Sequence, residues 1–329
     1  MDRKEDYKQF CRSNYVPIYS QPWWMDAICG PDNWDVWLCE KGGSDIAAMP
    51  YYTEKRGDYF YITKAPLTQN NGIIFKEENR KLAKEAAFQE HVINEACDFI
   101  ESLHLDVYEQ QFQHTFKNWS PFSWRNYTAV LRYSYIIEDT SDMERIWGNF
   151  TAENRNVIRK GQRLTKICYD LSPEDFYQEH NRIYRRQGLE CPFSFELWMR
   201  LYKACKEKES GQILCALDEH GEINAVMYYI WDDRSVYLLM GGAMPEYSGN
   251  QGYPALIYHG ISFAHERGLV FDFEGSMIKR IARSYREYGG VPMPYYRIRK
   301  VFNPEIIRSE AEDYIKKCNS ETYTRNMNR

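Results

Sequence analysis

The sequence predicts an α/β protein with a mixed sheet, built from two similar units in tandem. Three observations predict this fold class. Short apolar runs separated by turns recur in both halves, a helical pattern follows each group of strands, and one group repeats residues of the other. The chain has 329 residues, which is long enough for two ordinary domains.

The first half reads as three strands, a helix and a further strand. Strands are expected at 35–39, 46–52 and 59–62, separated by turns that contain Gly, Asp and Lys. Apolar residues from Leu82 to Leu103 then recur at helical spacing and predict a helix over 77–103. A strand is expected at 105–108.

The second half repeats this order. Strands are expected at 213–217, 223–229, 236–240 and 270–273, with a helix at 254–267 before the last of them. At an offset of 177 residues four identities occur: Ile46 with Ile223, Ala48 with Ala225, Tyr51 with Tyr228, and Tyr52 with Tyr229. Residues 140–206 are expected to be mainly helical, so we place an N-terminal unit at 1–139 and a C-terminal unit at 140–329.

Composition narrows the class of protein. The formal net charge of −5 argues against a broadly nucleic-acid-binding surface, and no stretch approaches the ~20 apolar residues that a membrane helix requires. Nine scattered cysteines without a C-x-x-C pair predict a reducing, cytoplasmic location, with no disulfide frame and no zinc site. The seven histidines show no metal-ligand spacing. Aromatic residues make up 16% of the chain, which is typical of a large enzyme with polar-rimmed clefts.

Two basic segments are candidates for ligand binding. Arg155, Arg159 and Arg163 are four residues apart, so on a helix they form one cationic ridge, with Lys160 beside it. Such a ridge fits a phosphate, a carboxylate or an RNA backbone, although from spacing alone a solvated helix face is the simpler interpretation. The pair Arg185 and Arg186 closes the next predicted helix, where cations complement the helix dipole without any ligand.

A glycine-rich segment follows one strand of the second half. Glycines leave backbone N–H groups open, and the start of a helix binds phosphate or carbonyl oxygen readily. An ordinary strand-to-helix loop is an equally good interpretation. The candidate residues are Met240, Gly241, Gly242, Gly249 and Gly252.

Two carboxylates and a hydroxyl lie at the end of the last predicted strand. Ligands of open α/β sheets bind at such strand ends, and a partly buried Glu274 could act as a general base. Alternatively, Ser276 caps the next helix, and Asp272 or Glu274 pairs with an arginine. The first half contains no counterpart of the segment 272–276.

These segments resemble FemAB-like proteins of the GNAT acyltransferase superfamily. The resemblance spans residues 15–303 and is loose. It rests on the segments 21–24 (QPWW), 66–69 (PLTQ), 155–161 (RNVIRKG), 184–188 (YRRQG), 271–277 (FDFEGSM) and 295–298 (YYRI). It implies a FemAB-like architecture of two GNAT-like units and direct transfer of an acyl or aminoacyl group onto an amine.

The resemblance also implies the partners. Members of the family use aminoacyl-tRNA as donor and a peptidoglycan precursor as acceptor, and relatives in the superfamily use acyl-CoA, with no metal and no tightly bound cofactor. Here residues 249–255 do not match the spacing of the acyl-CoA loop. The net charge of −5 and the lack of a long heptad-like segment give little support for a tRNA partner, and nothing implies DNA.

From position and resemblance together we expect the following roles. Glu274 or Asp272 assists deprotonation of the amine, and backbone N–H groups of Met240–Gly242 polarise the carbonyl. Phosphate or carboxylate groups of the substrates would be held by Arg155, Arg159, Lys160, Arg297 and Lys300, with Ser276, Gly249, Gly252, Tyr295 and Tyr296 lining the cleft. The alternative is a binding module that has lost chemistry and recognises a sugar nucleotide, a peptide or a protein partner.

Overall fold

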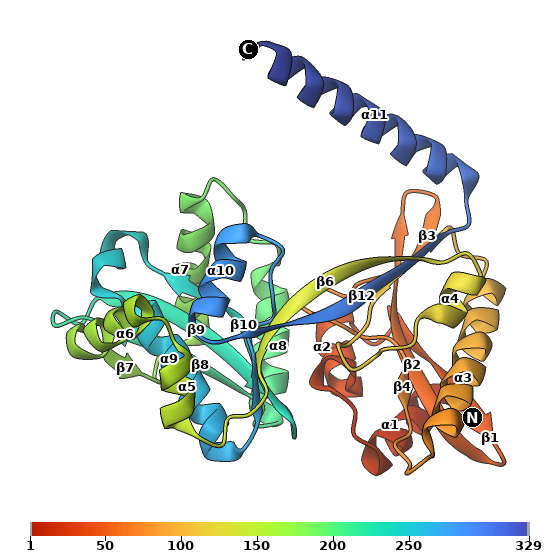
Figure 1. Cartoon of the computed structure of the whole chain (residues 1–329), viewed down its shortest axis with the longest axis horizontal. Helices are drawn as coiled ribbons and strands as arrows, with labels where there is room; N and C mark the ends of the chain where they lie inside the picture. The colour runs from red at the N-terminus through yellow and green to blue at the C-terminus, as the bar shows by residue number, and fades with distance from the viewer. Residues whose placement is uncertain (1, 328–329) are drawn as a thin grey trace.

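One mixed sheet runs through the whole protein. The computed structural model describes residues 2–327, and in that part of the chain twelve strands join in the order β1-β2-β3-β5-β12-β6-β11-β10-β9-β8-β7, with β4 paired to β2 (Figure 1). Within the same residues no helix is both long and apolar enough to cross a membrane.

The strands and helices alternate along the chain. The strands are β1 (Trp34–Lys41), β2 (Ser44–Arg56), β3 (Tyr59–Thr63), β4 (Ile74–Phe75), β5 (Val107–Gln111), β6 (Thr128–Ile137), β7 (Lys166–Cys168), β8 (Gly211–Leu217), β9 (Ile223–Trp231), β10 (Ser235–Ala243), β11 (Val270–Asp272) and β12 (Val291–Val301). The helices are α1 (Arg3–Ser13), α2 (Pro22–Cys29), α3 (Leu82–Ser102), α4 (Ser120–Trp124), α5 (Met143–Asn149), α6 (Ala152–Leu164), α7 (Pro173–Arg186), α8 (Phe195–Glu207), α9 (Gly252–Arg267), α10 (Lys279–Glu287) and α11 (Pro304–Met327), with short 3-10 helices η1 (Ile18–Ser20) and η2 (Pro245–Asn250).

The two halves share one topology, which confirms the prediction of two similar α/β units. In the first, β1, β2 and β3 are antiparallel neighbours, and β5 lies parallel to β3 after the crossover helix α3. In the second, β8, β9 and β10 are antiparallel neighbours, and β11 lies parallel to β10 after α9. Strand-helix-strand crossovers of this kind are right-handed, so α3 and α9 cover equivalent faces of their units.

The units exchange their last strands. β6 follows β5 in the chain but pairs with β11, whereas β12 follows β11 but pairs with β5. β6 and β12 also pair with each other along 128–136 and 291–299, and they form the long connection between the two lobes (Figure 1). Apart from β7, which adds an edge strand to the second unit, the strand order along this path therefore reads the same from either end, as expected of a local two-fold relation. The boundary that we placed at residue 139 stays a prediction.

The predicted offset between the repeats is wrong by one residue in β2 and β9. Tyr51 packs in the core beneath α3, whereas Tyr228 packs on the opposite face of its sheet and Tyr229 faces α9. Equivalent faces coincide at an offset of 178, which aligns Ala47 with Ala225, Met49 with Met227 and Tyr51 with Tyr229. Because side chains alternate between faces along a strand, a shift of one residue reverses every side chain.

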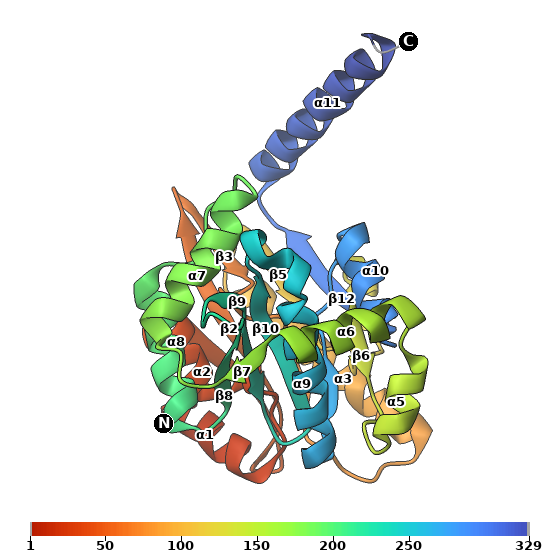
Figure 2. The ribbon, with the colours of Figure 1, turned by 90° about the vertical axis from the view of Figure 1, so that its left-hand side faces the viewer.

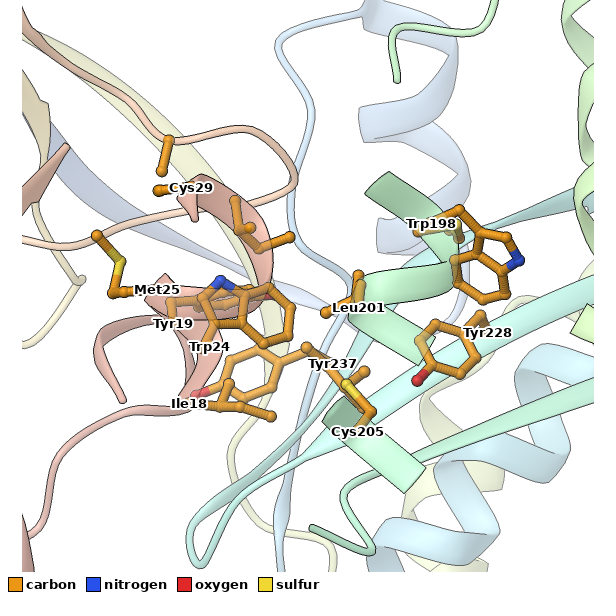
Figure 3. Close-up of a cluster of buried hydrophobic side chains, with 14 of the residues drawn as sticks. Ile18, Tyr19, Trp24, Met25, Cys29, Trp198, Leu201, Cys205, Tyr228 and Tyr237 are labelled. Carbon is orange, nitrogen blue, oxygen red and sulfur yellow. The ribbon is translucent and has the colours of Figure 1, made fainter. Parts of the chain in front are cut away.

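A shared hydrophobic core joins the units on the face opposite α3 and α9. It receives Tyr19 and Trp24 from the first unit and Trp198, Tyr228 and Tyr237 from the second (Figure 3). The rings of Tyr19 and Tyr237 approach to 5.2 Å between centroids. Two further cores lie beneath α3 and α9.

One helix differs from its predicted bounds, and another lies apart from the body of the protein. α3 begins at Leu82 rather than residue 77, and Leu82 is 90% exposed because it precedes the first turn that packs on the sheet. α11 extends away from the body and makes few contacts with it beyond β12 (Figures 1 and 2).

The turn after β11 requires glycine. Gly275 has φ +69°, and a Cβ there would overlap the carbonyl oxygen of Tyr133 in β6. We expect Gly275→Ala to lower the free energy of unfolding by about 3 kcal/mol, from the left-handed backbone and the clash together. Gly268→Ala is the matched control: it has φ +66° in open space, so it should cost only about 1 kcal/mol. Equal losses in urea unfolding of the two variants would contradict the close approach.

Candidate functional site

A cavity of about 410 Å³ lies where the two units meet, and we call it the central cavity. Both units contribute to it: the chain after β3, the ends of β5 and β11, the central strands β6 and β12, and the loop before α8. Its lining residues are Lys64, Pro66, Leu67, Thr68, Gln69, Gln111, Arg132, Pro192, Phe193, Leu239, Glu274, Gly275 and Tyr295.

Glu274 carries the most unusual group of the cavity. Its carboxylate oxygen Oε1 is buried and has no hydrogen-bond partner among residues 2–327. The backbone is in the left-handed region, with φ +65°. Two neighbours fix that conformation: Asp272 Oδ1 accepts from the Glu274 N–H at 2.7 Å, and Gln69 Nε2 donates to the Glu274 carbonyl at 2.5 Å.

Burial perturbs both carboxyl groups. It raises the pKa of Glu274 well above its usual range, because the carboxyl is desolvated and no described residue donates a hydrogen bond to Oε1. Burial also raises the pKa of Asp272 to about 6, against the opposing effect of hydrogen bonds from Ser134 Oγ and the Glu274 N–H. A raised pKa suits Glu274 to accept a proton from an amine, and Asp272 positions it.

Two cations and a phenol share the cavity with Glu274. Lys64 follows β3 and Arg132 lies in β6. Burial and the neighbouring Arg132 guanidinium lower the pKa of Lys64. Arg132 Nε donates to the Tyr295 hydroxyl at 3.4 Å. Neither cation has a carboxylate ion-pair partner within the described part of the chain, so both are available to an anionic group.

The central cavity lies at the local two-fold axis that relates the two units. Arg132 and Tyr295 are directly opposite each other at the centre of the β6–β12 pair. Pairing of Ile62 with Tyr108, and of Val236 with Phe271, makes Gln111 the equivalent of Glu274. The Gln111 amide is satisfied, because its Nε2 donates to the Gln69 carbonyl at 2.5 Å. The two units thus place an amide and a carboxylate at matching positions of one cavity.

The glycine-rich part of β10 borders the cavity. β10 bulges between Leu238 and Met240, and Leu239 points into the cavity. β10 pairs with β11 only from Ser235 to Tyr237, so within residues 2–327 the later part of that edge has no strand partner. Met240, Gly241 and Gly242 pair with β9 on one side and with no described strand on the other. None of the three lines the central cavity, so their oxyanion role stays a prediction.

The structure does not bring the predicted cations of α6 into the central cavity. Arg155 Nη1 donates to the carbonyls of Trp147, Gly148 and Phe150, so it closes the end of α5. Arg159 lies over the Trp147 ring at 5.2 Å, and Lys160 is exposed on the same helix. None of the three lines the cavity.

The predicted residues of β12 divide between its two faces. Tyr295 lines the central cavity, and Arg297, two residues on, lines a neighbouring cavity of about 380 Å³ with Arg299 and Glu109. Tyr296 packs against Trp119 on the opposite face.

Three further candidates have local partners. Lys300 Nζ donates to Glu101 Oε1 at 2.9 Å, so it belongs to an ion-pair network of the first unit. Ser276 Oγ accepts from the Ile278 N–H, but Ile278 itself is the N-cap of α10 and no side chain caps that helix, so the capping alternative is wrong. The Gly252 N–H donates to Asn224 Oδ1 at 3.2 Å, so it is not open to a phosphate. Gly249 is exposed in η2.

Sequence reasoning missed Lys64, Arg132, Gln69 and Gln111. Gln69 lies in the segment 66–69, which contributes to the family resemblance, but the sequence assigned it no role in a site. Arg132 lies on the same face of its strand as Ser134, which is a usable signal only when the partner strand is known.

Comparison with known proteins agrees with this architecture. Residues 151–288 match the family described as an acetyltransferase (GNAT) domain. The crystal structure of FemX has a TM-score of 0.67 at 11% identity, covering 90% of this chain and 96% of FemX. Residues 151–288 are therefore a GNAT domain, and the chain as a whole has a FemAB-like fold. Its two tandem GNAT-like units are those described above.

Other solved structures share this FemAB-like fold. The C-terminal domain of a protein named as a lysylphosphatidylglycerol synthetase from Agrobacterium fabrum has a TM-score of 0.55 at 11% identity, covering 90% of this chain and 92% of that one. L-PGS from Bacillus licheniformis has a TM-score of 0.51 at 13% identity, covering 82% and 85%. A comparison with curated proteins finds no match.

The perturbed carboxyl of Asp272 predicts a pH dependence of stability. A folded-state pKa of about 6, against an ordinary value of 3.8, means that the folded state binds the proton more tightly, so stability falls as pH rises between these values. Asp272→Asn retains an oxygen for both hydrogen bonds and removes the titration. We expect the variant to lose about 2 kcal/mol less than the wild type between pH 4 and pH 6.5 in urea unfolding. Parallel pH profiles would show that Asp272 titrates normally.

Proposed function

We propose that this protein transfers an acyl or aminoacyl group from an activated donor to an amine in the central cavity. The observation that carries the proposal is that Glu274, a residue lining a cavity with two cations, has a buried carboxylate oxygen without a hydrogen-bond partner among the described residues. An unsatisfied buried carboxyl is costly, and such groups concentrate at catalytic sites. The match to an acetyltransferase (GNAT) domain supports the reaction class.

The proposed step moves one proton and one acyl group. Glu274 takes a proton from the acceptor amine, and the amine nitrogen forms a bond to the donor carbonyl carbon. Backbone N–H groups of Met240–Gly242 stabilise the oxyanion as charge develops on the carbonyl oxygen. The carbonyl then reforms, and the bond to the donor sulfur or ester oxygen breaks. The leaving group takes up the proton that Glu274 received from the amine, so Glu274 returns to its ionised form.

Two classes of donor fit the proposed reaction, acyl-CoA and aminoacyl-tRNA. Acyl-CoA is the donor class of the GNAT superfamily, whereas the likeness to FemX supports an aminoacyl donor. Lys64 and Arg132 would hold a phosphate or carboxylate of either substrate, and Arg297 extends the basic lining into the neighbouring cavity. A cell-envelope precursor is an acceptor of suitable chemistry, because it combines an amine with anionic groups.

We assign the chemistry to the second unit and a binding role to the first. Gln111 stands where the second unit has Glu274, and an amide cannot act as a general base at neutral pH. This retains part of the alternative prediction, in which one unit has no catalytic activity and only binds a ligand or partner.

Replacing the base tests the proposal. We expect Glu274→Gln to lower kcat by about a hundredfold or more, the usual contribution of a general base, and to remove the rise of kcat with pH that follows ionisation of Glu274. Turnover would be measured with acyl-CoA and with aminoacyl-tRNA donors against amine acceptors. Glu219→Gln, an exposed change in the β8–β9 turn, is the matched control. Unchanged kcat in Glu274→Gln would refute the assignment of the base.

Replacing the cations tests which residues hold the anionic group. Lys64→Met and Arg132→Met should each raise the KM of the anionic substrate about tenfold or more, because a charge-assisted hydrogen bond contributes about 1.5–3 kcal/mol. Arg159→Met and Lys160→Met remove the α6 cations that the sequence predicts for the same task, and they should leave KM unchanged. A raised KM in the α6 variants, with an unchanged KM in Lys64→Met and Arg132→Met, would place the anion site on α6 instead.

A further inference from the structure

The end of α7 and the start of α10 form one exposed basic surface. Arg280 Nη2 donates to Gln187 Oε1 at 3.2 Å and joins the two helices, which lie at one end of the second unit (Figure 1). Segments 185–190 and 276–287 carry six Lys or Arg residues and two Glu residues, in a chain of net charge −5. We call these two segments the basic α7–α10 surface.

Most of its cations have no internal counter-charge. Arg283 pairs with Glu287 at 2.8 Å, and the adjacent Arg182 pairs with Glu179 at 2.6 Å. Within the described part of the chain no acidic partner exists for Arg185, Arg186, Lys279, Arg280 and Arg286. These five exposed cations are therefore available to an external anion.

Helix capping explains only part of this charge. Arg185 and Arg186 lie in the last turn of α7, where cations complement the helix dipole. Lys279 and Arg280 begin α10, whose first turn holds no acidic residue, and cations at a helix N-terminus oppose the dipole. These two cations disfavour the helix that carries them, so helix capping does not account for them.

Aliphatic side chains project beside the cations. Met277 is 53% exposed, Ile278 is 55% exposed, and Leu189 is 52% exposed. An RNA-binding surface instead presents aromatic rings for base stacking. The nearest ring of α10, Tyr285, is turned inward and stacks on Phe273 with 4.8 Å between centroids. Cations interleaved with exposed aliphatic groups match a lipid headgroup region.

We propose that the basic α7–α10 surface docks onto an anionic phospholipid bilayer. The cations contact lipid phosphates, and Met277, Ile278 and Leu189 enter the headgroup region. Because residues 276–278 directly follow Glu274 and Gly275, docking places the central cavity beside the bilayer. Binding itself does not depend on the proposed transfer reaction and is measured without it.

Sedimentation with vesicles tests the proposal on the full chain. The wild type should bind vesicles of equimolar phosphatidylcholine and phosphatidylglycerol, bind phosphatidylcholine vesicles far more weakly, and dissociate at high salt. Lys279→Gln with Arg280→Gln should weaken binding about thirtyfold, since two cations near the surface are lost. Met277→Ser with Ile278→Ser should weaken it about tenfold.

The control removes the same charge elsewhere. Lys81→Gln with Lys84→Gln changes two exposed lysines at the start of α3 and should bind like the wild type. Circular dichroism and Tm would show that each variant is folded. Equal binding to both kinds of vesicle would overturn the proposal. So would binding of a short single-stranded RNA through Lys279 and Arg280 with no effect of the aliphatic changes, because that pattern describes a nucleic-acid surface.

Discussion

The exchange of β6 and β12 is the constraint on which the rest of the structure depends. Each strand follows one unit in the chain and completes the sheet of the other, and nine residue pairs join the two strands. Separating the units would break this ladder and expose the shared core around Tyr19, Trp198 and Tyr237. Unpaired strand edges and buried aromatic rings are both costly to expose, so the units are held in one arrangement. The central cavity inherits that rigidity, because Arg132 and Tyr295 belong to the exchanged strands.

The same symmetry brings together residues that duplication has made different. Gln111 and Glu274 occupy equivalent positions, yet one is a satisfied amide and the other a carboxyl with an unpartnered oxygen. A left-handed glutamate backbone and an unsatisfied carboxyl each cost stability, and both persist only where neighbours over-determine the local structure. Asp272 and Gln69 supply that restraint from the two units, so the first unit contributes to the geometry of Glu274 without a base of its own.

Local patterns predicted the elements, and long-range pairing decided what those patterns could not. Turn residues and periodicity placed the strands near 46–52 and 223–229, because these signals act over a few neighbours. Counting identities chose the wrong offset, since identity ignores which face a side chain occupies, and Tyr51 and Tyr228 show the consequence. Glu274 could be singled out because it closely follows an obvious strand, and its role stays a prediction. Lys64 and Arg132 were missed because strands distant in sequence bring them together, and helical spacing says nothing of Arg155 turning back onto α5.

The electrostatics of the central cavity explain why a buried glutamate suits amine chemistry. Desolvation raises the pKa of Glu274, and it lowers the pKa of an ammonium group that enters the same space. The shift already seen for Lys64 has the same cause. A carboxylate and an ammonium in a dry cavity therefore exchange a proton to give the neutral acid and the neutral amine, and the neutral amine is the nucleophile. Arg132 keeps its charge throughout, because a guanidinium does not lose its proton in proteins, so the cavity retains one fixed cation for an anionic group while the proton moves.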